Sequence, residues 1–208
     1  MDWAPYKQMR VPPVKETKVS PCIAGIGSRK TPTAVLATME AIGKWCRENN
    51  WWVRSGHAPG ADLAFEQGAL DNTIVYLPWP GFNGPCLTRY AISLDRVRRE
   101  VRAKAQRSVN YFHPNPSALS GTGYRFMCRN YFQIFGTKIE PNPVSAVVCW
   151  TPGGTGGGGT GQAIRIARHH KIPVIDLGNT GQSDLFSSPG PYTVDEIIKY
   201  LKSIVVPA

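Results

Sequence analysis

A glycine-dense segment is the part of this sequence whose residue types point most directly to chemistry. It runs from Thr151 to Gln162 and reads TPGGTGGGGTGQ, between an apolar run typical of a buried strand and an expected helix. Ordering so many glycines costs conformational entropy, and a ligand pocket built from their backbone would offset that cost. Successive N–H groups at a helix N-terminus bind phosphate. We therefore predict an anion cradle that contains Pro152, Gly153, Gly154, Thr155, Gly156, Gly159, Thr160 and Gln162.

A second candidate phosphate contact follows an apolar run near the start of the chain. Gly25 and Gly27 would let the backbone approach a ligand, and Ser28, Arg29 and Lys30 would offer a hydroxyl group and two cations. The pattern is not the dinucleotide fingerprint G-x-G-x-x-G, because Lys30 occupies the position of the third glycine. A tight turn with solvated cations is the alternative interpretation. The glycine-dense segment lacks the G-K-[ST] ending of a P-loop, which argues against ATP hydrolysis by that mechanism.

Two acidic residues follow a third loop. Asp62 and Glu66 stand four residues apart, so one face of a helix carries both carboxylates. Either acid is a candidate for acid–base chemistry or for binding a ribose hydroxyl. Asp62 has the alternative role of a helix cap, and Glu66 that of a solvated or arginine-paired side chain. We expect the loop before them to line the ligand through Ser55, Gly56, His57 and Gly60.

Short apolar strands alternate with helices in a pattern that would position these loops. The expected strands cover residues 22–27, 51–54, 73–77, 144–150 and 172–177. The expected helices cover residues 32–50 with Thr31 as N-cap, 61–70, 161–170 and a last helix capped by Thr193. Nearly continuous apolar strands between helices indicate a mainly parallel sheet with helices on both faces. The predicted fold is Rossmann-like α/β, in which ligands lie at the carboxyl ends of the strands.

Residues 80–143 interrupt this alternation. Two helices are expected there, over residues 93–109 and 124–135, and the first carries basic residues around an apolar stripe. We interpret the region as a helical insertion over the sheet edge or the ligand crevice, within a single domain that spans residues 21–208. Residues 1–20 contain prolines and no periodicity, and we interpret them as an irregular leader.

Composition and charge limit the partners. The chain has 208 residues and a net charge of +10, so polyanions and small anionic ligands are the expected partners. No apolar run reaches the roughly 18 residues of a membrane span, and the first residues resemble no secretory signal, so we expect a cytoplasmic protein without a membrane partner. The five cysteines are scattered without a C-x-x-C pair, and we expect neither a metal site nor a cofactor. We also expect a homo-oligomer.

The motifs resemble the SLOG superfamily, which includes the DNA-processing protein DprA and the LOG phosphoribohydrolases. The resemblance covers roughly residues 20–178 and rests on Gly25 to Ser28, on Ser55-Gly56-x-Ala58-x-Gly60-x-Asp62 and on Pro152-Gly153-Gly154-x-Gly156. Further motifs, Arg129-Asn130 among them, resemble small phage-encoded DprA-like proteins. The resemblance implies a Rossmann-like fold, a nucleotide or nucleotide-derived ligand, and Arg129 and Asn130 as ligand-binding residues. It also implies a phage source and hence the host cytoplasm.

Three functions are consistent with the motifs and the resemblance. The first is a binding protein that holds a nucleotide or an ADP-ribose-like molecule by its phosphates, which a phage could use to sequester a host nucleotide signal. The second is a LOG-like hydrolase of N-glycosidic bonds, with Glu66 or Asp62 as the catalytic acid. LOG enzymes carry that glutamate on the helix after the glycine motif, whereas no acid occurs here between Thr151 and Asp176. The third is a DprA-like recombination accessory protein that binds single-stranded DNA through its basic helix.

Overall fold

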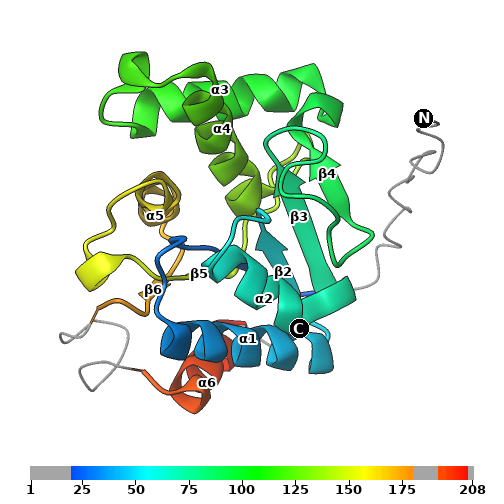
Figure 1. Cartoon of the computed structure of the whole chain (residues 1–208), viewed down its shortest axis with the longest axis vertical. Helices are drawn as coiled ribbons and strands as arrows, with labels where there is room; N and C mark the ends of the chain where they lie inside the picture. Colours follow the sequence, from blue (N-terminus) through cyan, green and yellow to red (C-terminus); the bar gives the residue numbers. More distant parts are fainter. Residues whose placement is uncertain (1–19, 180–191, 206–208) are drawn as a thin grey trace.

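Among the residues that the structure describes, six short strands form one sheet at the centre of the molecule (Figure 1). The computed structural model describes residues 20–179 and 192–205, so nearly all of the predicted leader lies outside the described residues. Every strand pair is parallel, and the strand order is β4-β3-β2-β1-β5-β6. The strands are β1 Cys22–Gly25, β2 Trp52–Ser55, β3 Thr73–Leu77, β4 Ala91–Ser93, β5 Ala146–Cys149 and β6 Val174–Asp176. The predicted Rossmann-like α/β fold is confirmed.

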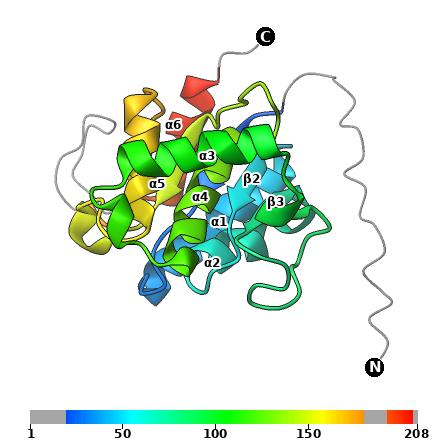
Figure 2. The ribbon, with the colours of Figure 1, turned by 90° about the horizontal axis from the view of Figure 1, so that it is seen from above.

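Helices cover both faces of the sheet, as the apolar strands predicted. The helices are α1 Thr33–Glu48, α2 Ala61–Ala69, α3 Arg99–Phe112, α4 Gly121–Phe135, α5 Thr160–His169 and α6 Val194–Ile204. Alternate strand residues point to opposite faces, so Ile23 packs with α1, α2 and α6 while its neighbour Ala24 packs with α3, α4 and α5. Figure 1 shows α1 and α6 at the bottom of the view, and Figure 2 looks onto the layer that contains α3.

The region of residues 80–143 differs from its prediction in two places. The edge strand β4 was not predicted, because three residues are too few to show an alternating pattern. The helix expected from Ser93 begins at Arg99 instead, since Ser93 ends β4 and residues Leu94–Arg96 form a separate 3-10 turn. The Ser93 hydroxyl accepts a hydrogen bond from the Asp95 N–H at 3.4 Å, which favours this turn over a continuous helix.

The helix caps were predicted with mixed success. Thr193 caps α6, as predicted, and the structure adds a full capping box with Glu196. At α1 the predicted cap was wrong by one residue, because Pro32 is the N-cap and the Thr31 hydroxyl donates to the Ser28 carbonyl at 2.7 Å. Thr31 therefore stabilises the turn after β1 instead of the first turn of the helix. No helix among residues 20–179 and 192–205 combines the length and apolar character needed to cross a bilayer.

The chain topology opens a crevice between β1 and β5. The connection after β1 leads through α1 to β2, whereas the connection after β5 leads through α5 to β6 on the other side. These two helices lie on opposite faces of the sheet. Neighbouring loops therefore separate at the carboxyl ends of β1 and β5, which is where open parallel sheets bind ligands.

Candidate functional site

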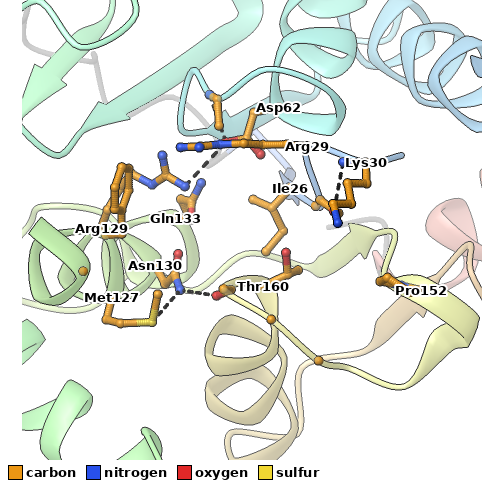
Figure 3. Close-up of a pocket in the computed structure, with 18 of the residues that line it drawn as sticks. Ile26, Arg29, Lys30, Asp62, Met127, Arg129, Asn130, Gln133, Pro152 and Thr160 are labelled. Carbon is orange, nitrogen blue, oxygen red and sulfur yellow. Dashed lines mark hydrogen bonds and ion pairs between the residues drawn. The ribbon is translucent and has the colours of Figure 1, made fainter. Parts of the chain in front are cut away.

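A cavity of about 460 Å³ lies at this separation of the loops (Figure 3). Its walls come from the loop after β1, the start of α2, one face of α4 and the glycine-dense segment after β5. The structure thus brings together segments that are far apart in the sequence.

About half of the predicted ligand-binding residues line this cavity. The lining set contains Gly27, Ser28, Arg29, Asp62, Arg129, Asn130, Pro152, Thr155, Gly159 and Thr160. The remaining predicted residues do not line it: Gly25, Ser55, Gly56, His57, Gly60, Glu66, Gly153, Gly154, Gly156 and Gln162. Several of these support the walls from behind, as described below.

Buried hydrogen bonds fix the start of the glycine-dense segment to the end of β6. The Asp176 carboxylate accepts hydrogen bonds from the backbone N–H groups of Thr151 at 2.8 Å and Gly178 at 3.0 Å. The Thr151 hydroxyl donates to the same carboxylate and accepts from the Gly156 N–H at 2.9 Å. Sequence analysis assigned no role to Asp176. Its position directly at the end of β6, beside β5, is the signal that could have identified it.

Some glycines of this segment serve close packing. Gly154 has a φ of +65°, and a Cβ atom there would lie 2.6 Å from the Asn179 backbone. At Gly161 a Cβ atom would lie 2.1 Å from the Gly156 carbonyl oxygen. Such distances exclude a side chain without movement of the backbone. These glycines therefore shape the segment without contacting the cavity.

Part of the segment that lines the cavity leads into the N-terminus of α5. Gly157, Gly158 and Gly159 are exposed and line the cavity, and within the described part of the chain their N–H groups donate no hydrogen bond. The Asn130 side chain donates to the Gly159 carbonyl at 2.9 Å and so ties the segment to α4. Free N–H groups at the positive end of a helix attract an anion.

Basic side chains flank these N–H groups. Arg29 and Lys30 are exposed at the rim of the cavity, while Arg129 is only 8% exposed. The guanidinium groups of Arg29 and Arg129 lie 5.8 and 5.4 Å from the centre of the Phe126 ring. Arg129 donates to the Gly56 carbonyl at 2.8 Å, and its burial lowers the pKa of its guanidinium group.

Asp62 is the buried acid of the cavity. Its Oδ2 atom lies 3.6 Å from Arg129 Nη2 and accepts a hydrogen bond from the Ala58 N–H at 3.3 Å. Burial raises the pKa of Asp62 to about 6, and the charge of Arg129 opposes this rise. Asp62 is not the N-cap of α2, because Gly60 occupies that position. Its carboxylate can accept hydrogen bonds from a ligand hydroxyl.

Glu66 is separated from the cavity by its contacts with His57. Its carboxylate accepts from the His57 N–H at 2.8 Å and pairs with His57 Nδ1 at 2.7 Å. Hydrogen bonds to Cys86 and Glu66 raise the pKa of His57 to about 10, so the imidazole is protonated at neutral pH. His57 has a φ of +60°, and the Asn83 side chain donates to its carbonyl at 2.7 Å. This ion pair fixes the loop that leads into α2.

The α4 wall contains several of the cavity residues that sequence analysis missed. Gly123, Phe126, Met127 and Gln133 line the cavity together with Arg129 and Asn130. Side chains three or four positions apart share one face of a helix, so extension from Arg129 and Asn130 along that face would have identified this set.

The fold and the cavity define a class: a doubly wound, parallel α/β protein with a ligand crevice at its topological switch point. Solved structures with this fold include DNA processing protein A from Helicobacter pylori, described for its single-stranded DNA binding mode. That match has a TM-score of 0.58 and 17% identity, and covers 88% of this chain and 80% of the other. A structure of the molybdenum cofactor carrier protein from Chlamydomonas reinhardtii matches with a TM-score of 0.54 and 16% identity, over 89% of this chain and 97% of the other.

These comparisons establish the likeness of fold. A second structure of the Chlamydomonas carrier protein matches similarly, with a TM-score of 0.53 and 16% identity, over 89% of this chain and 98% of that one. No protein-family model and no curated protein matches the chain. The expected resemblance to DprA is thus confirmed at the level of the fold.

Proposed function

We propose that this protein binds a nucleotide or a nucleotide derivative such as ADP-ribose, with its phosphates at the N-terminus of α5. One observation supports the proposal most: Gly157, Gly158 and Gly159, whose N–H groups donate no hydrogen bond within the described residues, line the same cavity as Arg29 and Lys30. Backbone donors and flexible cations together recognise phosphate. The position at the switch point, where nucleotides bind in this fold class, supports the proposal further.

The arrangement of the acids favours binding over hydrolysis of the ligand. Glu66 is engaged by His57 outside the cavity, so it is not available to a ligand. Asp62 does line the cavity, but its position beside Arg129 suits a hydrogen bond to a ribose hydroxyl. Capture without turnover is what a protein that sequesters a nucleotide signal requires, including a host signal if the chain comes from a phage.

A matched pair of variants at Gly159 tests the phosphate site. Gly159 has a φ of −61°, and a Cβ atom there would meet only Met127 Cε at 3.7 Å, so a side chain fits. Asp and Asn have the same shape, but Asp adds a negative charge beside the N–H groups. We expect G159D to bind ADP-ribose at least about tenfold more weakly than G159N, as measured by isothermal titration calorimetry. Equal affinity of the two folded variants would refute the phosphate site.

Whether the ligand remains intact distinguishes a binding protein from the alternative, an N-glycosidic hydrolase. After incubation of the wild-type protein with ADP-ribose, AMP or NAD⁺, chromatography should recover each compound intact. Release of a free base or of ribose 5-phosphate above a protein-free control would show turnover, and would make Asp62 the acid to examine first.

Single-stranded DNA is the second candidate ligand. The observation in its favour is basic surface: the chain carries a net charge of +10, and Arg98, Arg99 and Arg107 are exposed on or beside α3. The structural neighbour from Helicobacter pylori is described as binding such DNA. Binding to an oligothymidylate should then weaken steeply as salt increases, because phosphate contacts release counterions. A weak and salt-independent response would remove this candidate.

A further inference from the structure

Gln133 is a cavity residue whose side chain has no hydrogen-bond partner within the described part of the chain. It is 1% exposed, and neither Oε1 nor Nε2 forms a hydrogen bond within the described residues. It belongs to α4 and lies beside Arg129 in the cavity (Figure 3). A buried amide without partners destabilises a protein, so an unpaired amide at a cavity wall indicates a partner within the cavity.

Gly56 leaves the space that this amide occupies. A Cβ atom at Gly56 would lie 2.7 Å from Gln133 Nε2 and 2.6 Å from Arg129 Cζ, so only glycine at residue 56 leaves space for both side chains. Although Gly56 does not line the cavity, it therefore shapes the part of the wall where Gln133 and Arg129 lie. Its carbonyl also fixes Arg129 through the 2.8 Å hydrogen bond.

The cavity has two chemically different ends. The exposed rim carries Arg29, Lys30 and the glycine N–H groups, which suit the phosphates. The buried floor carries Gln133 and Asp62, each 1% exposed, and Arg129 at 8%. A nucleotide held by its phosphates at the rim would thus place its less charged part against the amide on the floor.

A glutamine amide presents one hydrogen-bond donor group beside one acceptor. Its complement is a ligand edge with an acceptor beside a donor, such as the ring nitrogen and the amino group of adenine, which glutamine binds in a bidentate manner. Ile26, Phe126 and Met127 add apolar surface to the same cavity, which suits the faces of a base.

We infer that Gln133 is the base-recognition residue of this site and that the bound nucleotide carries adenine. The Nε2 group donates to a ring nitrogen of adenine, and Oε1 accepts from the exocyclic amino group. The inference rests on the proposed function, because it takes the phosphates to be at the N-terminus of α5.

Three probes distinguish the contribution of the base to binding affinity from that of the phosphate. Adenosine 5′-monophosphate (AMP) carries the complete edge, purine riboside 5′-monophosphate lacks the amino group, and ribose 5-phosphate lacks the base. For the wild-type protein, calorimetry should show AMP binding about tenfold or more tightly than purine riboside 5′-monophosphate. This comparison needs no variant, so it holds even where a substitution impairs folding.

A variant of Gln133 and a control variant complete the test. Ser108, on α3, is also buried with a hydroxyl group that has no partner within the described residues, and it does not line the cavity. Gln133→Leu should weaken AMP binding about 10- to 100-fold and leave ribose 5-phosphate binding unchanged within about twofold. Ser108→Ala should change neither affinity, and thermal melting of both variants verifies folding.

The outcomes distinguish this inference from the proposed function. If the phosphate probes bind the wild type but AMP and purine riboside 5′-monophosphate bind equally, the inference is overturned and the phosphate site stands. The same holds if folded Gln133→Leu binds AMP as tightly as the wild type, which would mean that water satisfies the amide. If none of the three probes binds the wild type, both the inference and the proposed function are overturned.

Discussion

Asp62 and Glu66 lie one turn apart on α2 and are each 1% exposed, yet they belong to different regions of the molecule. Asp62 reaches the cavity, where Arg129 is its cationic neighbour at 3.6 Å. Glu66 reaches the preceding loop and forms two contacts with His57. An i, i+4 spacing therefore places two acids on the same side of a helix without giving them the same role. The contacts of each buried carboxylate with its neighbours determine whether that carboxylate can also bind a ligand.

Of the substitutions considered, Glu66→Gln should reduce the stability of the protein most. The substitution removes the negative charge and leaves the protonated His57 buried without its ion-pair partner. Loss of one member of a buried pair is costly, so we expect the free energy of unfolding at pH 7 to fall by about 3 kcal/mol, measured by urea denaturation. Glu40→Gln, at an exposed position of α1, should change it by less than about 0.5 kcal/mol. Equal stability of the two variants would contradict a structural role for Glu66.

The pH dependence of stability should also report on the contact between Glu66 and His57. The pKa of His57 is about 10 in the folded protein, raised from 6.5 by its hydrogen bonds with Cys86 and Glu66. A raised folded pKa means that the folded state binds a proton more tightly than the unfolded state. The stabilisation is therefore complete below about pH 6.5 and is lost as the pH rises toward about 10. Unfolding measured from pH 7 to pH 10 should show this loss in the wild type and a smaller one in Glu66→Gln, which keeps the contact of His57 with Cys86.

The features that could be predicted from the sequence are those set by local patterns. The apolar run around Val147 and Val148 predicted a buried strand, and Thr193 predicted a helix start. Those signals are contained within a few neighbouring residues. The strand β4 carries too few residues for any period to show.

The site was less accessible to sequence analysis, because its contacts join distant segments. Nothing near Glu66 in the sequence indicates that His57, in a left-handed conformation, would turn its imidazole back toward it. Likewise, nothing near Gln133 in the sequence indicates that Gly56, in the loop after β2, lies against it. Position on a helix face could have suggested Gln133 as a candidate, but its lack of a partner is a property of the packed structure.

Asp62→Asn should leave stability nearly unchanged and act on the ligand instead. Burial of a charged carboxylate is unfavourable, which is why the pKa of Asp62 rises to about 6, and Arg129 keeps its hydrogen bond to Gly56 without it. We therefore expect a change of less than about 1 kcal/mol in the free energy of unfolding at pH 7. The affinity for ADP-ribose should fall about tenfold, since a charged acceptor for a ribose hydroxyl is lost.

The pH profile of binding provides the control for this variant. In the wild type, Asp62 becomes a charged acceptor as the pH rises through about 6, so the affinity for ADP-ribose should increase over that range. The diphosphate of ADP-ribose stays ionised throughout, so the ligand itself contributes no comparable change. Asp62→Asn should show a flat profile. If the variant instead loses as much stability as Glu66→Gln while its ligand affinity is unchanged, the two acids are both structural and the contrast between them fails.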